Sequence, residues 1–364
     1  MTMLWVTRQN LGAGQTSVLF GHTAFYKARE DYAADLLAIG AQPLDMFMYY
    51  YRDEPDDVLD GRLDGMLAGF RYGDVLIIQM PFFIRPLNIK RLIEKIHDVY
   101  HGQVIAFIHD FEPLRQKSMA AQDQDSDPWL DQYSYRTYGV LYPLFDALIV
   151  NNDRVAAALR EYLHYTKPII SQGPFGYHTA DHIPTPHFAK KLVFAGAFIK
   201  AGYLQHLPAD CPIDVFGANP PDEFNRMPNV HYRGDYPPAE LPSQLNSGFG
   251  LVWDSTDFPA VTGELGEYTR LSYAQKISLY LAARLPVIIW REAAGAEWLT
   301  ANGVGLAIDN LAEAWPLIDS FDEARYGAMQ ARLGPLSQLI REGVYVKQAA
   351  LRAYATVNTQ SSDF

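Results

Sequence analysis

Residues 74–109 read DVLIIQMPFFIRPLNIKRLIEKIHDVYHGQVIAFIH, in which two short apolar runs, at 74–80 and 103–109, flank a longer segment. In that segment, at 87–100, the apolar residues recur at helical spacing. A strand that is apolar on both faces must be covered on both, which is the situation of a strand in a parallel sheet. The stretch therefore predicts a strand–helix–strand unit with parallel strands.

The same alternation continues through the chain. Further short apolar runs typical of buried strands occur at 3–7, 44–50, 146–150, 191–195, 213–217, 248–252, 286–290 and 304–308. Helical spacing indicates helices at 24–39, 56–69, 152–163, 237–246, 273–283, 311–318, 322–341 and 344–356. The predicted fold class is therefore α/β, with doubly wound parallel sheets.

Residues 172–187, QGPFGYHTADHIPTPH, interrupt the alternation with three prolines and two glycines, and are typical of a connector. At about 150 residues per domain, a chain of 364 residues holds two domains. We expect Rossmann-like domains at 1–172 and 173–342 and a last helical segment at 343–364. Two such domains on one linker predict a deep cleft, with ligands beyond the carboxyl ends of the strands.

Composition excludes several classes of function. Lysine and arginine number 30 against 42 acidic residues, a formal charge of −12, which argues against sequence-independent nucleic-acid binding and against a polybasic membrane patch. The single cysteine, Cys211, can form no internal disulfide or thiolate metal cluster. No apolar run of ~18 residues occurs and the N-terminus lacks a signal core, so we expect a cytoplasmic protein with at most peripheral contact with the inner membrane face. The 23 tyrosines and 19 phenylalanines leave homo-oligomerisation open.

Two strand ends in the first half carry candidate chemistry. The segment RQNLGAGQTS, residues 8–17, has glycines that would allow close backbone approach to a ligand, but it lacks the third glycine of the dinucleotide fingerprint and the Gly-Lys-Ser/Thr of a P-loop. A plain strand-to-helix turn explains it equally well. His109 and Asp110 end the strand at 103–109 and could act as general base and orienting carboxylate. A core histidine beside a turn-capping aspartate is the alternative.

Two polar clusters do not predict a metal site. The acidic run DQDSD at 123–127 lacks the glycine and the distal glutamate of a calcium loop. Histidines 178, 182 and 187 lie among prolines, which do not form the helix that an i, i+4 zinc pair needs. We therefore expect no metal and no other cofactor.

The second half is richer in strand-end candidates. Gly196 and Lys200 lie in FAGAFIKAG at 194–202, and Tyr232 is expected just after a short strand in VHYRGDYP at 230–237. Lys276 and Ser278 fall in the first turns of a helix between two strands, where free N–H groups and an ammonium suit a diphosphate. Glu267 could accept ribose hydroxyls, and Tyr232 could pack on a base. A solvated helix start with surface charges fits the same residues.

At these residues the sequence resembles the bacterial family of glucosyltransferase-3-like and β-1,6-galactofuranosyltransferase proteins, sugar transferases of the GT-B fold. The segments that carry the resemblance are RLDGMLAGFRYGDVLIIQMP (62–81), FIHDFEPL (107–114), FGLVWDS (249–255), GEY (266–268) and SYAQKISLYLAARLPVII (272–289). It implies two Rossmann-like domains facing a cleft, with the C-terminal helix crossing back to the first domain. It also implies transfer of a hexose, galactofuranose or glucose, from a UDP-sugar to a glycan or glycosylated acceptor in cell-surface polysaccharide or glycoprotein biosynthesis.

The resemblance also implies roles for particular residues. The nucleotide would lie on the second domain, Lys200 would meet phosphate, Tyr232 would lie near the nucleotide, and a loop near Thr16 and Ser17 would close over the donor. Lys276 and Lys200, together with the helix start, would stabilise the charge of leaving UDP without a metal. If the reaction inverts, His109 or Asp110 would be the base. The expected donor-binding residues are Thr16, Ser17, Gly196, Lys200, Tyr232, Glu267, Tyr273, Ala274, Gln275, Lys276, Ile277 and Ser278.

The sequence departs from the family pattern at two places. Position 200 is a lysine where an arginine is familiar, so a bidentate phosphate contact is not available there. Residues 117–131 form a longer, more acidic insertion in the domain that should select the acceptor. Two alternatives to a transferase remain at this stage: a catalytically idle protein that binds a glycan or nucleotide sugar in an assembly complex, and a dinucleotide-dependent oxidoreductase, which the missing fingerprint disfavours.

Overall fold

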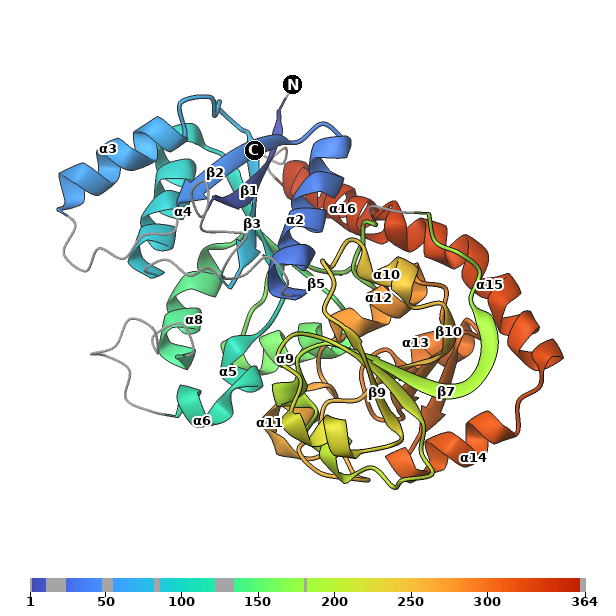
Figure 1. The fold of residues 1–364 in the computed structure, drawn as a ribbon. Helices are drawn as coiled ribbons and strands as arrows, with labels where there is room; N and C mark the ends of the chain where they lie inside the picture. Colours follow the sequence, from blue (N-terminus) through green and yellow to red (C-terminus); the bar gives the residue numbers. More distant parts are fainter. Residues whose placement is uncertain are drawn as a thin grey trace. The chain divides into compact units, whose positions relative to one another are not determined.

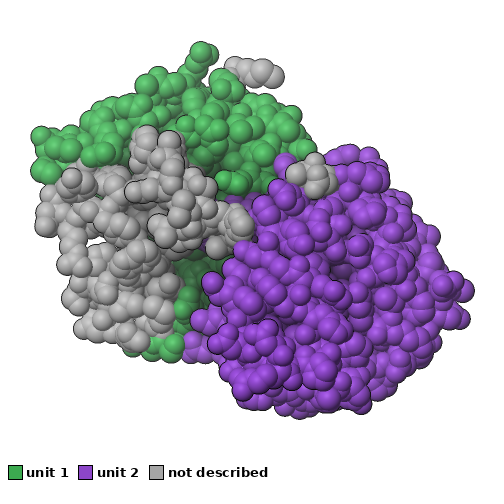
Figure 2. Space-filling view, in the orientation of Figure 1, with its two compact units in different colours: residues 1–21, 29–173, 345–364 green, residues 22–28, 174–344 purple. Residues whose placement is uncertain are grey.

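The computed structural model describes residues 2–10, 24–47, 55–81, 86–121, 134–179 and 182–360. The chain divides into two compact units: residues 1–21, 29–173 and 345–364 form unit 1, and residues 22–28 and 174–344 form unit 2 (Figure 2). Each unit has a six-stranded parallel sheet with helices between the strands (Figure 1). The predicted α/β class with two doubly wound sheets is confirmed.

The sheet of unit 1 has the strand order β2-β1-β3-β4-β5-β6, and all its neighbours pair in parallel. The order therefore reverses between β1 and β3. Its strands are β1 (Leu4–Asn10), β2 (Gln42–Phe47), β3 (Val75–Met80), β4 (Gln103–Ile108), β5 (Ala147–Val150) and β6 (Ile169–Ser171). The helices of the first half are α2 (Ala24–Ala38), α3 (Asp56–Met66), α4 (Pro86–Tyr100), α5 (Glu112–Arg115), α6 (Lys117–Ala120), α8 (Tyr135–Leu141), the 3-10 turn η1 (Tyr142–Leu144) and α9 (Asp153–Leu163).

Residues 345–360 of the last helix, α16 (Val344–Gln360), belong to unit 1, and polar contacts join them to other elements of that unit. The Tyr354 hydroxyl donates to the carbonyl oxygen of Thr2 at 2.8 Å, and the Arg352 guanidinium donates to the carbonyl oxygen of Ser171 at 2.8 Å. Lys347 Nζ lies 3.6 Å from the buried carboxylate of Asp35. These contacts tie the C-terminal segment to the start of β1, to the end of β6 and to α2.

The sheet of unit 2 has the strand order β12-β11-β10-β7-β8-β9, again with every neighbour in parallel. This is the strand order of dinucleotide-binding α/β domains, with the reversal between β7 and β10. Its strands are β7 (His187–Ala195), β8 (Ile213–Phe216), β9 (Val230–Gly234), β10 (Ser247–Val252), β11 (Val287–Trp290) and β12 (Gly305–Ile308).

The helices of unit 2 are α10 (Leu241–Gln244), α11 (Gly263–Tyr268), α12 (Gln275–Ala282), α13 (Ala296–Ala301), α14 (Ala314–Asp319) and α15 (Glu323–Arg341). Four 3-10 turns complete it: η2 (Phe198–Lys200), η3 (Gly202–His206), η4 (Asp222–Arg226) and η5 (Leu311–Glu313). Helix α12 packs against β10, β11 and α15. Among the described residues, none of the helices combines the length and the hydropathy needed to cross a bilayer.

Several elements differ from the sequence expectation. The helix expected at 237–246 shrinks to α10, because prolines 237, 238 and 242 remove N–H donors there. The short elements β6, α11 and α13 were not predicted, since three to six residues carry too little periodicity to be recognised. Tyr232, expected after a strand, lies inside β9.

The strands at the centre of each sheet show why parallel pairing was recognisable. All six residues of β3 and all six of β10 are buried. Polar residues within the sheets need internal partners, because burying an unpaired polar group or charge is unfavourable. One such residue, Asp214 on β8, is buried in the middle of unit 2.

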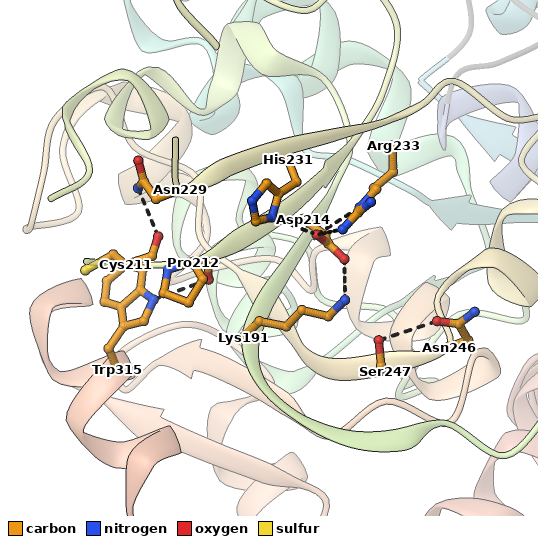
Figure 3. Close-up of polar contacts among 10 residues, drawn as sticks. All are labelled: Lys191, Cys211, Pro212, Asp214, Asn229, His231, Arg233, Asn246, Ser247 and Trp315. Carbon is orange, nitrogen blue, oxygen red and sulfur yellow. Dashed lines mark hydrogen bonds and ion pairs between the residues drawn. The ribbon is translucent and has the colours of Figure 1, made fainter. Parts of the chain in front are cut away.

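Asp214 joins three strands on one face of the sheet (Figure 3). Its carboxylate accepts from Lys191 Nζ of β7 at 2.5 Å and from the Arg233 guanidinium of β9 at 2.9 Å, and His231 Nδ1 lies 3.4 Å away. Burial alone would raise the pKa of Asp214, but the hydrogen bonds and charges of Lys191 and Arg233 outweigh it and hold that pKa below its ordinary value. The network fixes the edge strand β9 to the rest of the sheet.

We expect Asp214→Asn to lower the free energy of unfolding at pH 7 by about 1–3 kcal/mol, because two charge-assisted hydrogen bonds to a buried carboxylate are lost. Since the folded-state pKa of Asp214 is depressed, its contribution is complete above the unfolded pKa of about 3.9 and disappears as pH falls through the folded value. Urea denaturation at pH 7 and at lower pH should show the deficit of the variant shrinking with acidification.

Asp222→Asn, at an exposed aspartate of the same unit, serves as the control and should change stability by no more than about 0.5 kcal/mol. A deficit in Asp214→Asn that stays constant down to acidic pH would contradict the ionic role of Asp214.

Candidate functional site

The reversal of strand order in unit 2 marks the expected position of a ligand-binding site. Open α/β sheets bind ligands beyond the carboxyl ends of the two strands at which the order reverses. In unit 2 these strands are β7 and β10, whose pairing ends at Val193 and Gly250. The residues that follow, from Ala195 and from Val252 onward, are therefore at the position where a ligand is expected.

A tyrosine hydroxyl lies between the two strands just past the end of their pairing. The Tyr280 hydroxyl, from α12, accepts the N–H of Ala195 at 3.0 Å and donates to the carbonyl of Leu251 at 3.2 Å. Its ring covers Gly250 so closely that a Cβ at that position would overlap it. The glycine on β10 therefore allows α12 to approach the sheet, and the hydroxyl satisfies two backbone groups that no longer pair with each other.

The side chain of Lys276, in the first turn of α12, is held by three other elements. Its ammonium lies 2.5 Å from the Asp254 carboxylate after β10 and 5.2 Å from the ring centre of Phe194 on β7. Both members of the ion pair are nearly buried, with side-chain exposures of 12% and 11%. A Cβ on Gly196 would lie 3.0 Å from Lys276 Cε, so the lysine side chain passes close to the backbone of the residue after β7. The lysine thus lies at the strand-order reversal with its charge paired.

Two glycines let the backbone turn closely at the ends of β7 and β8. Gly196 has a φ of 153° and Gly217 has the same φ, and a Cβ on Gly217 would overlap the carbonyl oxygen of Gly196. The Tyr232 hydroxyl donates to the carbonyl of Gly217 at 3.1 Å, while 43% of the Tyr232 residue remains exposed. An exposed aromatic ring anchored at its tip beside two glycines offers a flat apolar surface.

Ala274 is the N-cap residue of α12, and no side chain in the part of the chain that the structure describes caps this helix N-terminus. The carboxamide of Gln275 and the hydroxyl of Ser278 are buried without a hydrogen-bond partner among the described residues. The Tyr273 ring packs against Gly295, and Ile277 is buried beside it. An uncapped N-terminus with N–H groups and a lysine in its first turn is a favourable place for an anion.

The other predicted donor-site residues are placed as follows. Lys200 ends η2, and its carbonyl accepts the N–H of Ser255 at 3.0 Å, which joins the segment after β7 to the segment after β10. Glu267, on α11, is half-exposed and pairs with Arg270 at 2.7 Å. Arg270 also pairs with Glu292 and stacks on Trp290. Thr16 and Ser17 lie outside the described residues, as does the acidic run at 123–127.

In unit 1, His109 lies directly after β4 and is buried. Gln79 donates through Nε2 to the carbonyl oxygens of Thr7 and Arg29, at 2.9 and 3.3 Å, so its Oε1 accepts from His109 Nε2 at 2.8 Å. Burial, and after it the positive charge of Arg29, hold the pKa of His109 well below its ordinary value. The imidazole is therefore neutral at neutral pH and a weak proton acceptor.

Asp110, the next residue, lies in a different environment. Its side chain is 29% exposed and its carboxylate lies 3.9 Å from Arg115 Nε. Arg115 is held more closely by Glu112, at 2.7 Å, and Glu112 is buried. Burial, only partly offset by Arg115, raises the pKa of Glu112 above its ordinary value. The end of β4 thus carries one accessible carboxylate beside an ion pair of the buried Glu112 with the partly exposed Arg115.

Among the residues that were not assigned from the sequence are Asp254, Glu112 and Arg115. Asp254 and Glu112 fall within the segments FGLVWDS and FIHDFEPL, and a charge immediately after an apolar strand was the available signal for Asp254. Their pairing with Lys276 and Arg115 depends on side-chain directions that spacing does not reveal. In the described part of the chain, no group of three or more histidine, cysteine, aspartate or glutamate side chains is arranged to hold a metal ion.

Comparison with known families gives two matches that together span most of the chain. The family model described as "Glucosyltransferase 3-like, N-terminal domain" matches residues 4–174, and the corresponding C-terminal domain model matches residues 192–353. Over 338 residues the chain is 29% identical to Glucosyltransferase 3 of Streptococcus gordonii, covering 93% of this chain and 96% of that protein. Over 292 residues it is 25% identical to the β-1,6-galactofuranosyltransferase WbbI of Escherichia coli K12, covering 79% and 81%.

Solved structures share the fold at low sequence identity. A sucrose-phosphate synthase from Thermosynechococcus elongatus has a TM-score of 0.61 at 13% identity, covering 98% of this chain and 100% of that one. AviGT4, a glycosyltransferase of avilamycin A biosynthesis, has a TM-score of 0.53 at 12% identity, covering 100% and 99%. The architecture is the two-domain GT-B fold.

We expect Tyr280→Phe to lower the free energy of unfolding by about 1–3 kcal/mol, because the buried N–H of Ala195 and the carbonyl of Leu251 lose their shared partner. Chemical denaturation measures the change. Tyr72→Phe, at a tyrosine that is 75% exposed, is the control and should be neutral. Equal stability of the two variants would show that the Tyr280 hydroxyl does not bridge the strands.

Proposed function

The chain belongs to the glucosyltransferase 3-like family of glycosyltransferases, and we propose that it transfers a hexosyl group from a UDP-sugar to a glycan or glycosylated acceptor, without a metal. The proposed hexose is glucose or galactofuranose, the sugars in the names of its relatives. Cell-surface polysaccharide or glycoprotein biosynthesis is the proposed setting.

One observation carries the donor-site proposal. At the strand-order reversal of unit 2, the ammonium of Lys276 and the uncapped N-terminus of α12 lie in the same helical turn. A diphosphate complements both, because the ammonium supplies a point charge and the free N–H groups supply directed donors. Tyr232, exposed beside the glycines that end β7 and β8, is the proposed platform for the uracil base.

The proposed chemistry follows from where charge develops. As the anomeric C–O bond of the donor breaks, the leaving UDP gains negative charge on its terminal phosphate. Lys276 and the N–H groups of α12 would stabilise this charge in place before the bond breaks, so they need no rearrangement during the reaction. Loss of one such donor should slow transfer by about 10²–10³-fold.

For an inverting reaction, Asp110 is the proposed base in preference to His109. A base must remove the proton of the acceptor hydroxyl, and His109 is less suited to this because it is buried and its pKa is held well below the ordinary value, which makes it a weak proton acceptor. Asp110 is accessible, and Glu112 binds Arg115 at 2.7 Å while Arg115 Nε stays 3.9 Å from Asp110. The buried glutamate therefore holds Arg115 more closely than Asp110 does, and the Asp110 carboxylate stays accessible to an acceptor.

The donor-site test is calorimetric titration with UDP, with ADP, GDP and NAD as comparisons. Lys276→Ala alone would leave the carboxylate of Asp254 buried and unpaired, which would lower the stability of the fold. The double variant Lys276→Ala/Asp254→Asn removes both charges together. We expect the wild-type chain to prefer UDP, with EDTA making no difference, and the double variant to bind UDP at least about tenfold more weakly, the effect of losing a charge-assisted hydrogen bond.

Asp309→Asn/Arg291→Ala, which removes an exposed ion pair of the same unit, is the matched control. Unchanged UDP affinity in the folded double variant would refute the phosphate assignment. Selective UDP binding together with no transfer of hexose from any UDP-hexose would favour the non-catalytic scaffold instead.

Asp110→Asn should lower the rate of transfer by about 10²–10⁴-fold with little change in UDP affinity, because it removes the proposed proton acceptor and leaves unit 2 unaltered. Steady-state kinetics with the acceptor varied give the rate. Asp98→Asn, an exposed aspartate on α4, is the control. Transfer at the wild-type rate in Asp110→Asn would exclude Asp110 as the base.

A further inference from the structure

We propose that Asp254 is a positioning residue, which fixes the ammonium of Lys276 at the orientation used on the donor diphosphate. The use of the ammonium on a diphosphate rests on the proposed function, whereas the contact between Asp254 and Lys276 does not depend on it. Asp254 follows the end of β10, Lys276 lies in the first turn of α12, and their charged atoms are 2.5 Å apart.

Lys276 is more constrained than an ordinary surface lysine. A surface lysine has several rotatable bonds and usually holds no fixed position, and an exposed ion pair contributes about 0–1 kcal/mol. Here the alkyl chain passes Gly196, the ammonium lies over the Phe194 ring at 5.2 Å, and the ammonium also pairs with the Asp254 carboxylate at 2.5 Å. Contacts from the ends of two neighbouring strands thus hold the side chain.

Stability alone does not explain why the Lys276–Asp254 pair is nearly buried. A nearly buried ion pair loses hydration on both members, and two well-packed apolar residues would be at least as stable. The pair lies beside the uncapped start of α12, the part of unit 2 where an anion is favoured. A fixed cation at that place stabilises developing charge without reorganising, whereas a mobile lysine would have to be ordered during the reaction.

The same carboxylate has an opposite effect on ground-state binding. Asp254 balances the charge of Lys276, so an arriving diphosphate meets a pair of zero net charge and is repelled by the carboxylate. Removing the carboxylate charge would therefore leave UDP affinity unchanged or make it tighter, while the loss of orientation slows transfer. A lower rate of transfer without weaker UDP binding distinguishes a positioning role from a structural one.

The first experiment reads the pairing directly, without UDP. An amine-reactive acetylating reagent is applied to the folded chain, and mass spectrometry follows modification of Lys276 over time. We expect Asp254→Asn to raise the rate at Lys276 by about tenfold, the effect of losing one charge-assisted hydrogen bond, and Asp309→Asn to leave it unchanged. An unchanged Lys276 rate in Asp254→Asn overturns the proposal.

The second experiment measures kcat and KM with the UDP-hexose that the wild-type chain uses. Asp254→Asn should lower kcat by about 10–100-fold, with a KM no higher than that of the wild type. Asp254→Glu keeps the charge but displaces the ammonium, so it should also lower kcat, and it serves if the asparagine variant does not fold. An unchanged kcat, or a raised KM at constant kcat, overturns the positioning role.

The two readouts separate this inference from the proposed function. If the wild-type chain neither binds UDP nor transfers a hexose, the proposed function fails, and the labelling of Lys276 still decides whether Asp254 holds it. If transfer is normal in the wild type and labelling does not respond to Asp254→Asn, the function stands and the positioning role falls.

Discussion

Coverage of both faces of a parallel sheet is the constraint from which the rest of the structure follows. Once helices cover both sides, the strand interiors accept apolar side chains, as all six positions of β3 and of β10 show. A polar side chain within the sheet survives only with internal partners, as Asp214 does with Lys191 and Arg233. Side chains that can bind or react are therefore found at the strand ends, which is where the Lys276–Asp254 pair and the Glu112–Arg115 pair lie.

At the strand ends, charges are held in opposed pairs. Lys276 faces Asp254 in unit 2, and Arg115 faces Glu112 in unit 1. In each pair a largely buried carboxylate orients the cation, which solvent alone would not hold in one position. His109 follows the other route, because burial and the nearby Arg29 keep it neutral. Each of these two cations is therefore held by its own carboxylate before any ligand arrives.

Sequence patterns gave the class of fold and the strand ends, and they did so through hydrophobic periodicity. The buried strands were recognisable because apolar runs such as 74–80 have no amphipathic alternative. Short elements such as α11 were not predicted. Tyr232 was expected just after a short strand but lies inside β9, since edge strands with exposed residues lack the apolar signal. The partner of Lys276 lies 22 residues away in the chain, and no local spacing encodes such a contact.

The Tyr280 bridge also constrains how this sequence can diverge. The ring occupies the volume above Gly250, and the hydroxyl serves backbone groups of two strands. A larger residue at 250 is admissible only if the side chain at 280 shrinks, and a smaller residue at 280 leaves an empty volume unless 250 grows, besides leaving two buried backbone groups without their shared partner. Either single step is less fit than both together, so the two positions are epistatic and should drift as a pair through the evolutionary history of this domain.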